Sequence, residues 1–292
     1  MSQKSFFVLA AMLLVLALTG GGAADAAVIL SGDKADAKGW QFSTDGFLNA
    51  FYVYEDAEAR PAGTVGGTIA AGKSSTIRTG LLPGLIAFNV KAPTTRGIDI
   101  TARIGFYPQI QNGDNAFAPG TRRTNFSSQI DTRELWVAAD GAFGQVLAGK
   151  ALNLFQGKSI LTDMTLFGVG ATGGPASGGT TLGHIGTGYL YAQFGPNIRY
   201  TTPDFGGFKA AISLTDPSII QGDAKADVRE TPGIEGEITY ATKFKNGTAQ
   251  VWVNGLYQNA KRNAAAASGT TPAVTALDVT ASGVSLDRKS VV

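Results

Sequence analysis

The chain has 292 residues and a formal net charge of +2, with 44% hydrophobic and 16% charged residues. Charged residues are scarcer than the roughly 25% of a typical soluble domain, and the near-neutral charge provides no broad basic surface for nucleic acid. The absence of cysteine excludes a disulfide framework and thiolate metal sites. The 39 glycines are typical of a chain rich in turns and disfavour a helical protein.

The first 26 residues predict a secretory signal peptide. Lys4 provides a basic start, Phe6–Leu18 forms a short apolar stretch, and Ala24-Asp25-Ala26 supplies the small residues expected before a cleavage site. The apolar stretch is shorter than the roughly 20 residues of a transmembrane helix, and no later segment reaches that length. We therefore expect the mature chain, residues 27–292, to leave the cytoplasm and not to cross a membrane as helices.

The mature chain shows repeated alternation of apolar and polar residues, which predicts β-strands. From Ile98 to Phe106, the even-numbered residues are apolar and Asp99, Thr101 and Arg103 alternate with them. About ten such strands are predicted. The others cover Trp40–Tyr54, Ile86–Val90, Thr132–Ala139, Gly144–Leu152, Tyr189–Thr202, Phe208–Leu214, Glu235–Lys243, Gln250–Asn259 and Ala276–Leu286.

The connections between these strands alternate between short and long. Short turns are expected at 93–97, 140–143, 203–207 and 245–248, and long loops at 56–76, 108–130, 153–188, 215–233 and 260–272. This alternation is typical of an outer-membrane β-barrel, with turns in the periplasm and loops outside. A soluble β-sandwich is the alternative, but charges in mid-strand, such as Asp99 and Arg103, disfavour it.

Two segments resemble the Gram-negative general porins. Phe143-Gly144-Gln145-Val146-Leu147-Ala148-Gly149-Lys150 is similar to the family's entry into a strand after a short turn. Ile198-Arg199-Tyr200-Thr201-Thr202-Pro203-Asp204-Phe205-Gly206-Gly207-Phe208 is similar to its next short hairpin. The resemblance extends from about Trp40 to the end of the chain. It implies a transmembrane antiparallel β-barrel of porin type in the outer membrane of a Gram-negative bacterium.

The resemblance also implies a water-filled channel for passive diffusion of small hydrophilic solutes and ions. Such porins form homotrimers of 16-stranded barrels in which the third long loop, here 153–188, narrows the pore. The chain departs from the family pattern at Leu147, where another basic residue is common, and at its end, which lacks the usual terminal aromatic residue. We therefore expect a C-terminally truncated barrel, short of about six strands, that does not form a stable pore alone.

Charged residues on the predicted polar faces are the candidate pore-lining residues, since charges around a channel set its ion preference. They are Arg78, Arg103, Arg133, Lys150 and Arg199, with Asp163 as the single acid of the third loop. One acid against several bases predicts a weakly anion-preferring or unselective pore. The alternative for each base is solvation at a strand end or pairing with Glu134 or Asp131.

Two other functions were weighed. A structural or adhesive barrel with a plugged lumen would conduct no current. A barrel enzyme would need a nucleophile and a base, but His184 is the single histidine and lies in a glycine-rich loop. Gly168-Val169-Gly170-Ala171-Thr172-Gly173 has the spelling of a dinucleotide motif without the helix that must follow it. We therefore predict no catalytic residue, cofactor or metal, and as partners outer-membrane lipid, small solutes and ions, but no nucleic acid.

Overall fold

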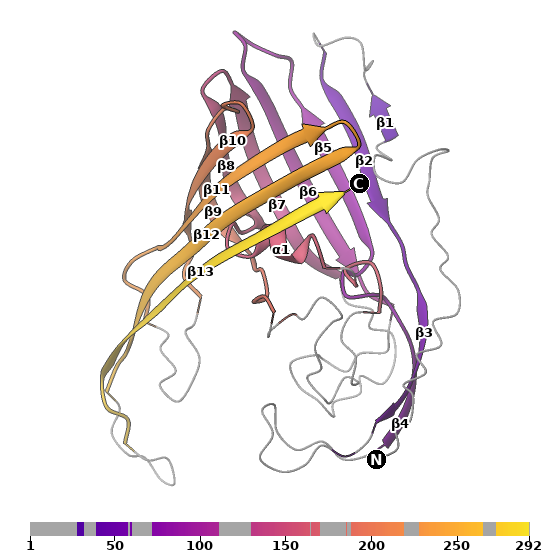
Figure 1. Ribbon diagram of the computed structural model, residues 1–292, viewed down its shortest axis with the longest axis vertical. Helices are drawn as coiled ribbons and strands as arrows, with labels where there is room; N and C mark the ends of the chain where they lie inside the picture. The colour runs from indigo at the N-terminus through magenta and orange to yellow at the C-terminus, as the bar shows by residue number, and fades with distance from the viewer. Residues whose placement is uncertain are drawn as a thin grey trace. The chain divides into compact units, whose positions relative to one another are not determined.

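Apart from one short helix, the regular secondary structure of the described residues is β-strand, as the sequence predicts. The structure, a computed structural model, describes residues 28–31, 39–57, 59, 72–110, 130–163, 165–169, 185, 188–218, 228–264 and 273–291 (Figure 1). These residues form thirteen strands and one four-residue helix. The chain divides into two units. The first comprises Met1–Val90, Arg103–Thr132 and Ile160–Tyr191, and the second Lys91–Ala102, Arg133–Ser159 and Ala192–Val292.

The second unit is an antiparallel meander in which strands follow one another in chain order. Each strand from β7 to β13 is paired antiparallel with the next. The strands are β7 (Ile130–Gly141, in this unit from Arg133), β8 (Gly144–Leu152), β9 (Phe194–Thr201), β10 (Phe208–Thr215), β11 (Gly233–Phe244), β12 (Gly247–Arg262) and β13 (Leu277–Val291). Helix α1 (Gly157–Ile160) lies in the segment that follows β8.

The predicted short turns are confirmed in this unit. Strands β7 and β8 pair as far as Gly141 and Gly144, and β11 and β12 pair as far as Phe244 and Gly247. Between β9 and β10, Asp204 Oδ1 accepts the backbone N–H of Gly207 at 2.7 Å. Gly207 has φ = 94°, a conformation that favours glycine because it has no Cβ. Local turn chemistry therefore fixes where each hairpin reverses.

The first unit contains β1 (Val28–Ser31), β2 (Gln41–Phe47), β3 (Phe51–Ala57), β4 (Gly72–Arg78), β5 (Leu85–Lys91, in this unit to Val90) and the end of β6 (Asp99–Pro108, from Arg103). Strand β1 pairs with β2, β5 follows β2 in the sheet, and β3 and β4 form a separate two-stranded sheet. The predicted single strand Trp40–Tyr54 is therefore wrong. The chain leaves the sheet after Phe47, and the Asn49 side chain accepts the Gly80 N–H and donates to the Leu82 carbonyl.

Three other predicted boundaries are also wrong. The expected loop 56–76 contains the start of β4, which pairs with β3 through backbone hydrogen bonds that require no apolar pattern. Strand β9 begins at Phe194, five residues later than predicted. The last residues lack alternation, yet β13 pairs with β12 as far as Val291. The signal peptide, His184, residues 170–173 of the glycine-rich motif and most of the long-loop residues lie outside the described residues.

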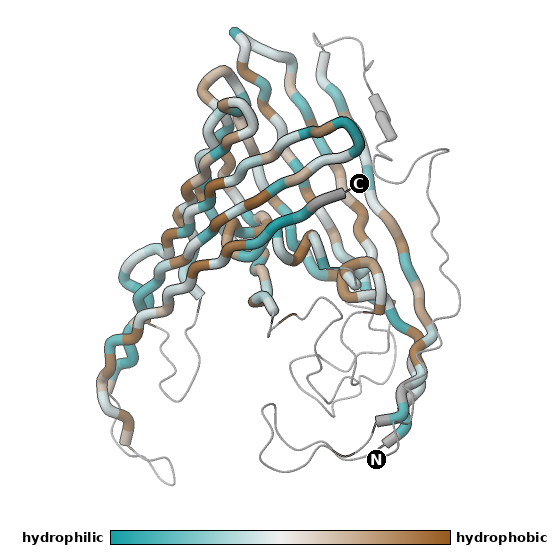
Figure 2. The backbone as a smooth tube through the Cα atoms, viewed as in Figure 1, coloured by the Kyte–Doolittle hydropathy of each residue, from teal (hydrophilic) through white to brown (hydrophobic). Residues whose placement is uncertain are grey.

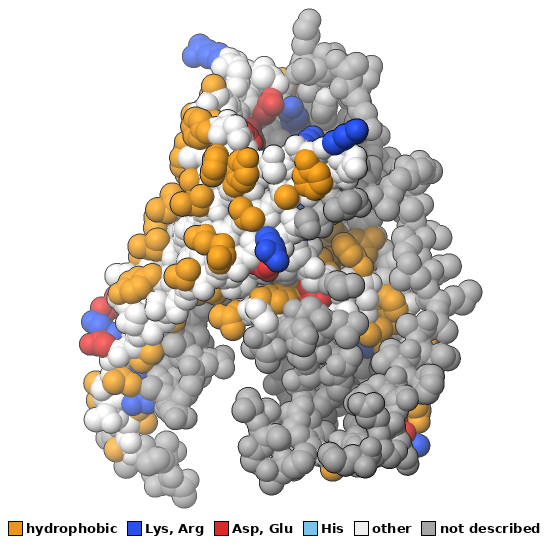
Figure 3. Space-filling model, in the orientation of Figure 1, with side chains coloured by type: hydrophobic (Ala, Val, Ile, Leu, Met, Phe, Trp, Pro, Cys, Tyr) orange, Lys and Arg blue, Asp and Glu red, His pale blue; other side chains and the backbone are white. Residues whose placement is uncertain are grey.

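The two faces of the second unit are reversed relative to a soluble protein. Figure 2 shows hydrophobic and hydrophilic residues alternating along its strands. On β10, Ser213 is 1% exposed, whereas neighbouring Ile212 is 55% exposed. On β11, Glu235 is 5% exposed and Ile238 is 58% exposed. Hydrophobic side chains also cover much of the face of β11 and β12 visible in Figure 3.

This reversal is the pattern expected of a strand with lipid on one side and a polar interior on the other. We call the two sides the apolar outer face and the polar inner face. The inner face of β7 and β8 departs from the pattern, because Trp136, Ala138, Leu147 and Ala151 pack together there.

Neighbouring residues of β10 test the assignment of the faces. We expect Ile212→Arg to lower the free energy of unfolding in lipid vesicles by about 2–4 kcal/mol, the usual effect of a cation facing the bilayer centre. Ala211→Arg introduces the same charge at the same depth on the inner face, opposite Glu237, and should have a much smaller effect. Urea titrations of both variants measure the difference. Equal destabilisation would contradict the assignment.

Candidate functional site

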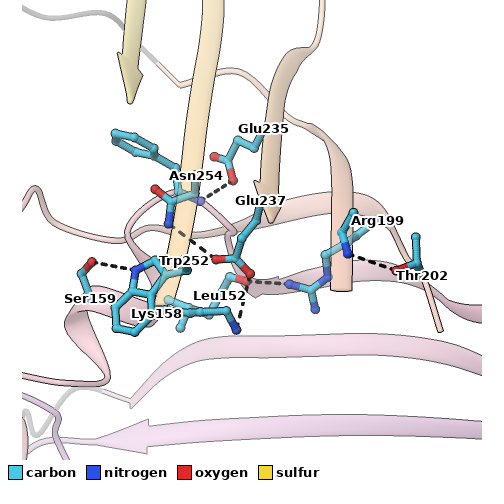
Figure 4. Close-up of polar contacts among 11 residues, drawn as sticks. Leu152, Lys158, Ser159, Arg199, Thr202, Glu235, Glu237, Trp252 and Asn254 are labelled. Atoms are coloured by element: carbon cyan, nitrogen blue, oxygen red, sulfur yellow. Dashed lines mark hydrogen bonds and ion pairs between the residues drawn. The ribbon is translucent and has the colours of Figure 1, made fainter. Parts of the chain in front are cut away.

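The segment that follows β8 lies against the polar inner face of β11 and β12 (Figure 4). Glu235 Oε2 accepts the backbone N–H of Phe155 at 3.0 Å, and its Oε1 accepts the side-chain amide of Asn153 at 3.3 Å. Glu235 is buried, and a buried carboxylate requires such donors. The start of this segment is therefore attached to the wall of the sheet by a charged group.

A second carboxylate on β11, that of Glu237, also binds the segment that follows β8. Glu237 forms an ion pair with Lys158 at 3.4 Å, and its Oε2 accepts the Asn254 side-chain amide at 3.5 Å. Trp252 is 1% exposed and its indole N–H donates to Ser159 Oγ at 3.4 Å. Figure 4 shows these side chains converging from β11, β12 and the segment that carries α1. Thus 153–159 is held at several points.

A glycine makes room for the same segment on β13. A Cβ added to Gly283 would lie 2.9 Å from Cζ of Phe155, too close for a real contact. The Phe155 ring therefore packs directly on the β13 backbone, and a larger residue at position 283 would displace it. Hydrogen bonds to Glu235 and the packing of the Phe155 ring thus hold Asn153 and Phe155 against the sheet.

Arg199 of β9 belongs to the same polar face. It lies directly opposite Ser213 of β10 and Leu147 of β8. Its Nη1 donates to the Leu152 carbonyl at 3.3 Å, at the point where the attached segment begins. Two acids, Glu235 and Glu237, are therefore accompanied on this face by the cations Arg199 and Lys158.

Several inner-face atoms of this unit are buried without a protein hydrogen-bond partner. Among the described side chains these include Asn197 Oδ1, Arg199 Nε, Ser213 Oγ and Asn254 Oδ1. These atoms belong to the same polar face as Glu235 and Glu237. Among the described residues, this face presents charged, amide and hydroxyl groups.

The first unit has its own polar cluster across three strands. Asp45 of β2 accepts from Arg103 Nη1 of β6 and from Asn89 Nδ2 of β5, both at 2.7 Å. Arg103 Nη1 also donates to Asn89 Oδ1 at 2.9 Å. The apolar residues that alternate with them on β5, Ile86 and Phe88, are 42% and 45% exposed. The same division into polar and apolar faces therefore holds in both units.

Comparison with known proteins identifies the family. A protein-family model of the Gram-negative porins matches residues 10–291, nearly the whole chain. The chain belongs to the Gram-negative porin family. It is therefore an outer-membrane porin with a transmembrane β-barrel fold, from a family that is in general not enzymatic. A search of curated proteins found no match.

No described helix is long and apolar enough to span a membrane. The described residues also contain no group of three or more histidine, cysteine, aspartate or glutamate side chains placed to hold a metal ion.

The structure places the predicted lining residues in different settings. Arg103 lies in the first-unit cluster, and Arg78 Nε, half-buried at the end of β4, donates to the Thr79 carbonyl at 3.2 Å. Asp163 is 7% exposed and accepts from the backbone and hydroxyl of Thr165 and from the Tyr189 hydroxyl. It therefore stabilises the fold of its own loop. Arg199 lies on the polar face of the second unit.

Arg133 and Lys150 are not placed on the polar face of this porin. Lys150 lies directly opposite Leu135 on β7 and Pro196 on β9. Leu135 is 56% exposed, so this is the apolar outer face. Arg133, two residues before Leu135, shares that face because successive strand residues alternate. The register therefore favours the face opposite to the one expected from the sequence for these two bases, because a one-residue difference in alternation changes the face.

Sequence reasoning missed Glu235 and Glu237 as functional residues. Both lie on β11 within the predicted strand Glu235–Lys243, and both alternate with apolar Ile234 and Ile238. That alternation was sufficient to place the two acids on the polar face. Their attachment to residues 153–159, far away in sequence, could not be predicted from it.

Loss of the Glu235 carboxylate should destabilise the porin. In Glu235→Ala, the Phe155 N–H and the Asn153 amide lose their acceptor, and we expect the free energy of unfolding in detergent to fall by about 1–3 kcal/mol. A matched control is Glu230→Ala, which removes an exposed ion pair with Lys261 and should lower it by less than about 1 kcal/mol. Similar losses in both variants would contradict the role given to Glu235.

Proposed function

We propose that this porin forms a water-filled channel for passive diffusion of small hydrophilic solutes and ions. The observation that carries the proposal is the polar inner face of β9–β12, which presents charged, hydroxyl and amide side chains. Diffusion requires a wet, charged lining and no catalytic group. The family supports the same function.

We further propose that the third long loop, 153–188, narrows this channel. Its first residues, from Asn153 to Ser159, already lie against the inner face of β11 and β12 and are attached through Glu235, Glu237 and Trp252. A segment held there occupies space that solutes would otherwise cross. By analogy with the family, we propose that residues 1–26 are a signal peptide and that residues 27–292 belong to the barrel. We also propose that three copies of the chain assemble into a homotrimer.

The charges of the inner face also bear on ion preference. The sequence predicts weak anion preference because Asp163 is the single acid of the loop. Glu235 and Glu237 add two acids beside Arg199 and Lys158, whereas Arg133 and Lys150 belong to the outer face. We therefore propose a weakly selective channel in which neither sign dominates.

Conductance in planar lipid bilayers tests the channel itself. We expect insertion of a purified full-length form of the porin to give steps of ohmic current in KCl. A barrel plugged by the attached segment, the structural or adhesive alternative, would insert without current, and that result would refute the proposal.

Opposite charge changes on the inner face should shift the reversal potential in a KCl gradient in opposite directions. Arg199→Gln leaves Glu235 and Glu237 less compensated, so we expect a shift toward cation preference. Glu237→Gln leaves Lys158 and Arg199 in excess, so the shift should be toward anions. Lys245→Gln, in the exposed β11–β12 turn, is the control and should leave the potential unchanged at ~0.1 M salt, where distant charges are screened. Shifts of the same sign in both test variants would be incompatible with these charges lining the path.

A further inference from the structure

Two neighbouring pairs of strands in the first unit are interrupted side by side. Residues 48–50 separate β2 from β3, and residues 79–84 separate β4 from β5. Strand β3 pairs with β4, and β2 is the neighbour of β5 in the larger sheet. Asn49 joins the two interruptions, because its side chain accepts the Gly80 N–H at 2.9 Å and donates to the Leu82 carbonyl at 3.2 Å. We call residues 48–50 and 79–84 together the strand break.

A segment of the third long loop supplies backbone partners to the strand break. The Leu81 N–H donates to the Gly168 carbonyl at 2.9 Å, and the Leu82 N–H donates to the Leu166 carbonyl at 3.0 Å. Leu166 is also buried, with 4% of its surface exposed. Backbone N–H groups need an acceptor wherever a regular strand pairing stops. The loop therefore satisfies two donors at the point where the strands are interrupted.

Gly80 allows the loop to approach this closely. A Cβ added to Gly80 would lie 2.3 Å from the Gly168 carbonyl oxygen, far closer than any real contact. The obstructing atom belongs to the backbone, so no side-chain rotation would relieve the clash. Glycine is typical of positions where another backbone comes into direct contact. Any side chain at position 80 would therefore displace Gly168 from the strand break.

The same loop segment is held by its own turns and by one aromatic contact. The Asp163 carboxylate accepts the Thr165 N–H at 2.8 Å, and the Gly168 N–H donates to the Thr165 carbonyl at 2.9 Å. The Phe167 ring packs edge-to-face on Phe47, with 5.4 Å between ring centres and 75° between ring planes. Aromatic pairs favour this arrangement. The segment thus has a defined shape where it meets the strand break.

We propose that the strand break is a seat for residues 165–168, and that Gly80 and Phe167 are positioning residues for the third long loop. This stretch is separate in sequence from 153–159, which β11 and β12 hold in the second unit. A loop fixed at two stretches has less conformational freedom than a loop fixed at one. The seat would therefore hold the width of the channel constant, a consequence that rests on the proposed narrowing by this loop.

The chain contains no cysteine, so a single cysteine reports whether the segment is seated. In the detergent-solubilised porin, Leu166→Cys should react slowly with a water-soluble maleimide. Adding Gly80→Ala should raise the rate about 10-fold, the effect of losing one or two hydrogen bonds. Adding Gly39→Ala is the matched control, because no atom lies within 4 Å of its added Cβ. Equal labelling rates in the two backgrounds would overturn the seat.

A second variant acts from the loop side and leaves the strands unchanged, so the test does not depend on the folding of Gly80→Ala. Phe167→Ala should raise the labelling rate of Leu166→Cys about 5-fold, on the scale of one aromatic pair. Its control is Leu161→Ala in the same loop, since Leu161 and Phe167 are 56% and 59% exposed. An unchanged rate in Phe167→Ala would overturn the positioning role of this ring.

The size limit for polyethylene glycols separates the seat from the proposed narrowing of the channel. It is measured from the conductance of a full-length form of the porin in planar bilayers. We expect Gly80→Ala and Phe167→Ala to admit larger polymers than Gly39→Ala and Leu161→Ala. Faster thiol labelling with an unchanged size limit would confirm the seat and would instead refute the narrowing by the third loop.

Discussion

The constraint behind this structure is that a strand in lipid must satisfy its backbone hydrogen bonds with other strands, because the hydrocarbon interior offers no other partner. Each strand of the β8–β12 meander is paired on both sides in the second unit. Once the backbone is satisfied in this way, the side chains separate by alternation alone. Apolar residues take the outer face and polar residues the inner one.

This separation explains how charged side chains can be buried without destabilising the fold. Glu235 and Glu237 are covered by residues of the same porin, and each has several donors within reach. Removing one donor would leave a buried carboxylate short of partners, which is unfavourable. The acids therefore hold the start of the third loop against the sheet, and in the proposed channel the same charges would lie where ions pass. Anchoring and lining are two consequences of one arrangement.

Much of the fold could be predicted because the period of alternation and the turn residues are local signals. Both ends of strand β8 were predicted correctly, and so was the position of the turn that contains Asp204 and Gly207. The break between β2 and β3 depends on Asn49 contacting residues about 30 positions away, which no local pattern contains. The candidate site was harder for the same reason. The face of Lys150 depended on counting the alternation to within one residue, and the attachment of 153–159 to β11 is a long-range contact.

The absence of cysteine from the whole sequence permits a direct test of the two faces. Single cysteines at positions 208–215 of β10, each carrying a nitroxide spin label in lipid vesicles, would report access to dissolved oxygen and to a water-soluble nickel complex. The account predicts a period of two, with oxygen favoured at Ile212 and Leu214 and not at Lys209 or Ala211. Equal access of the nickel complex to both sets would show that β10 is surrounded by water and would contradict it.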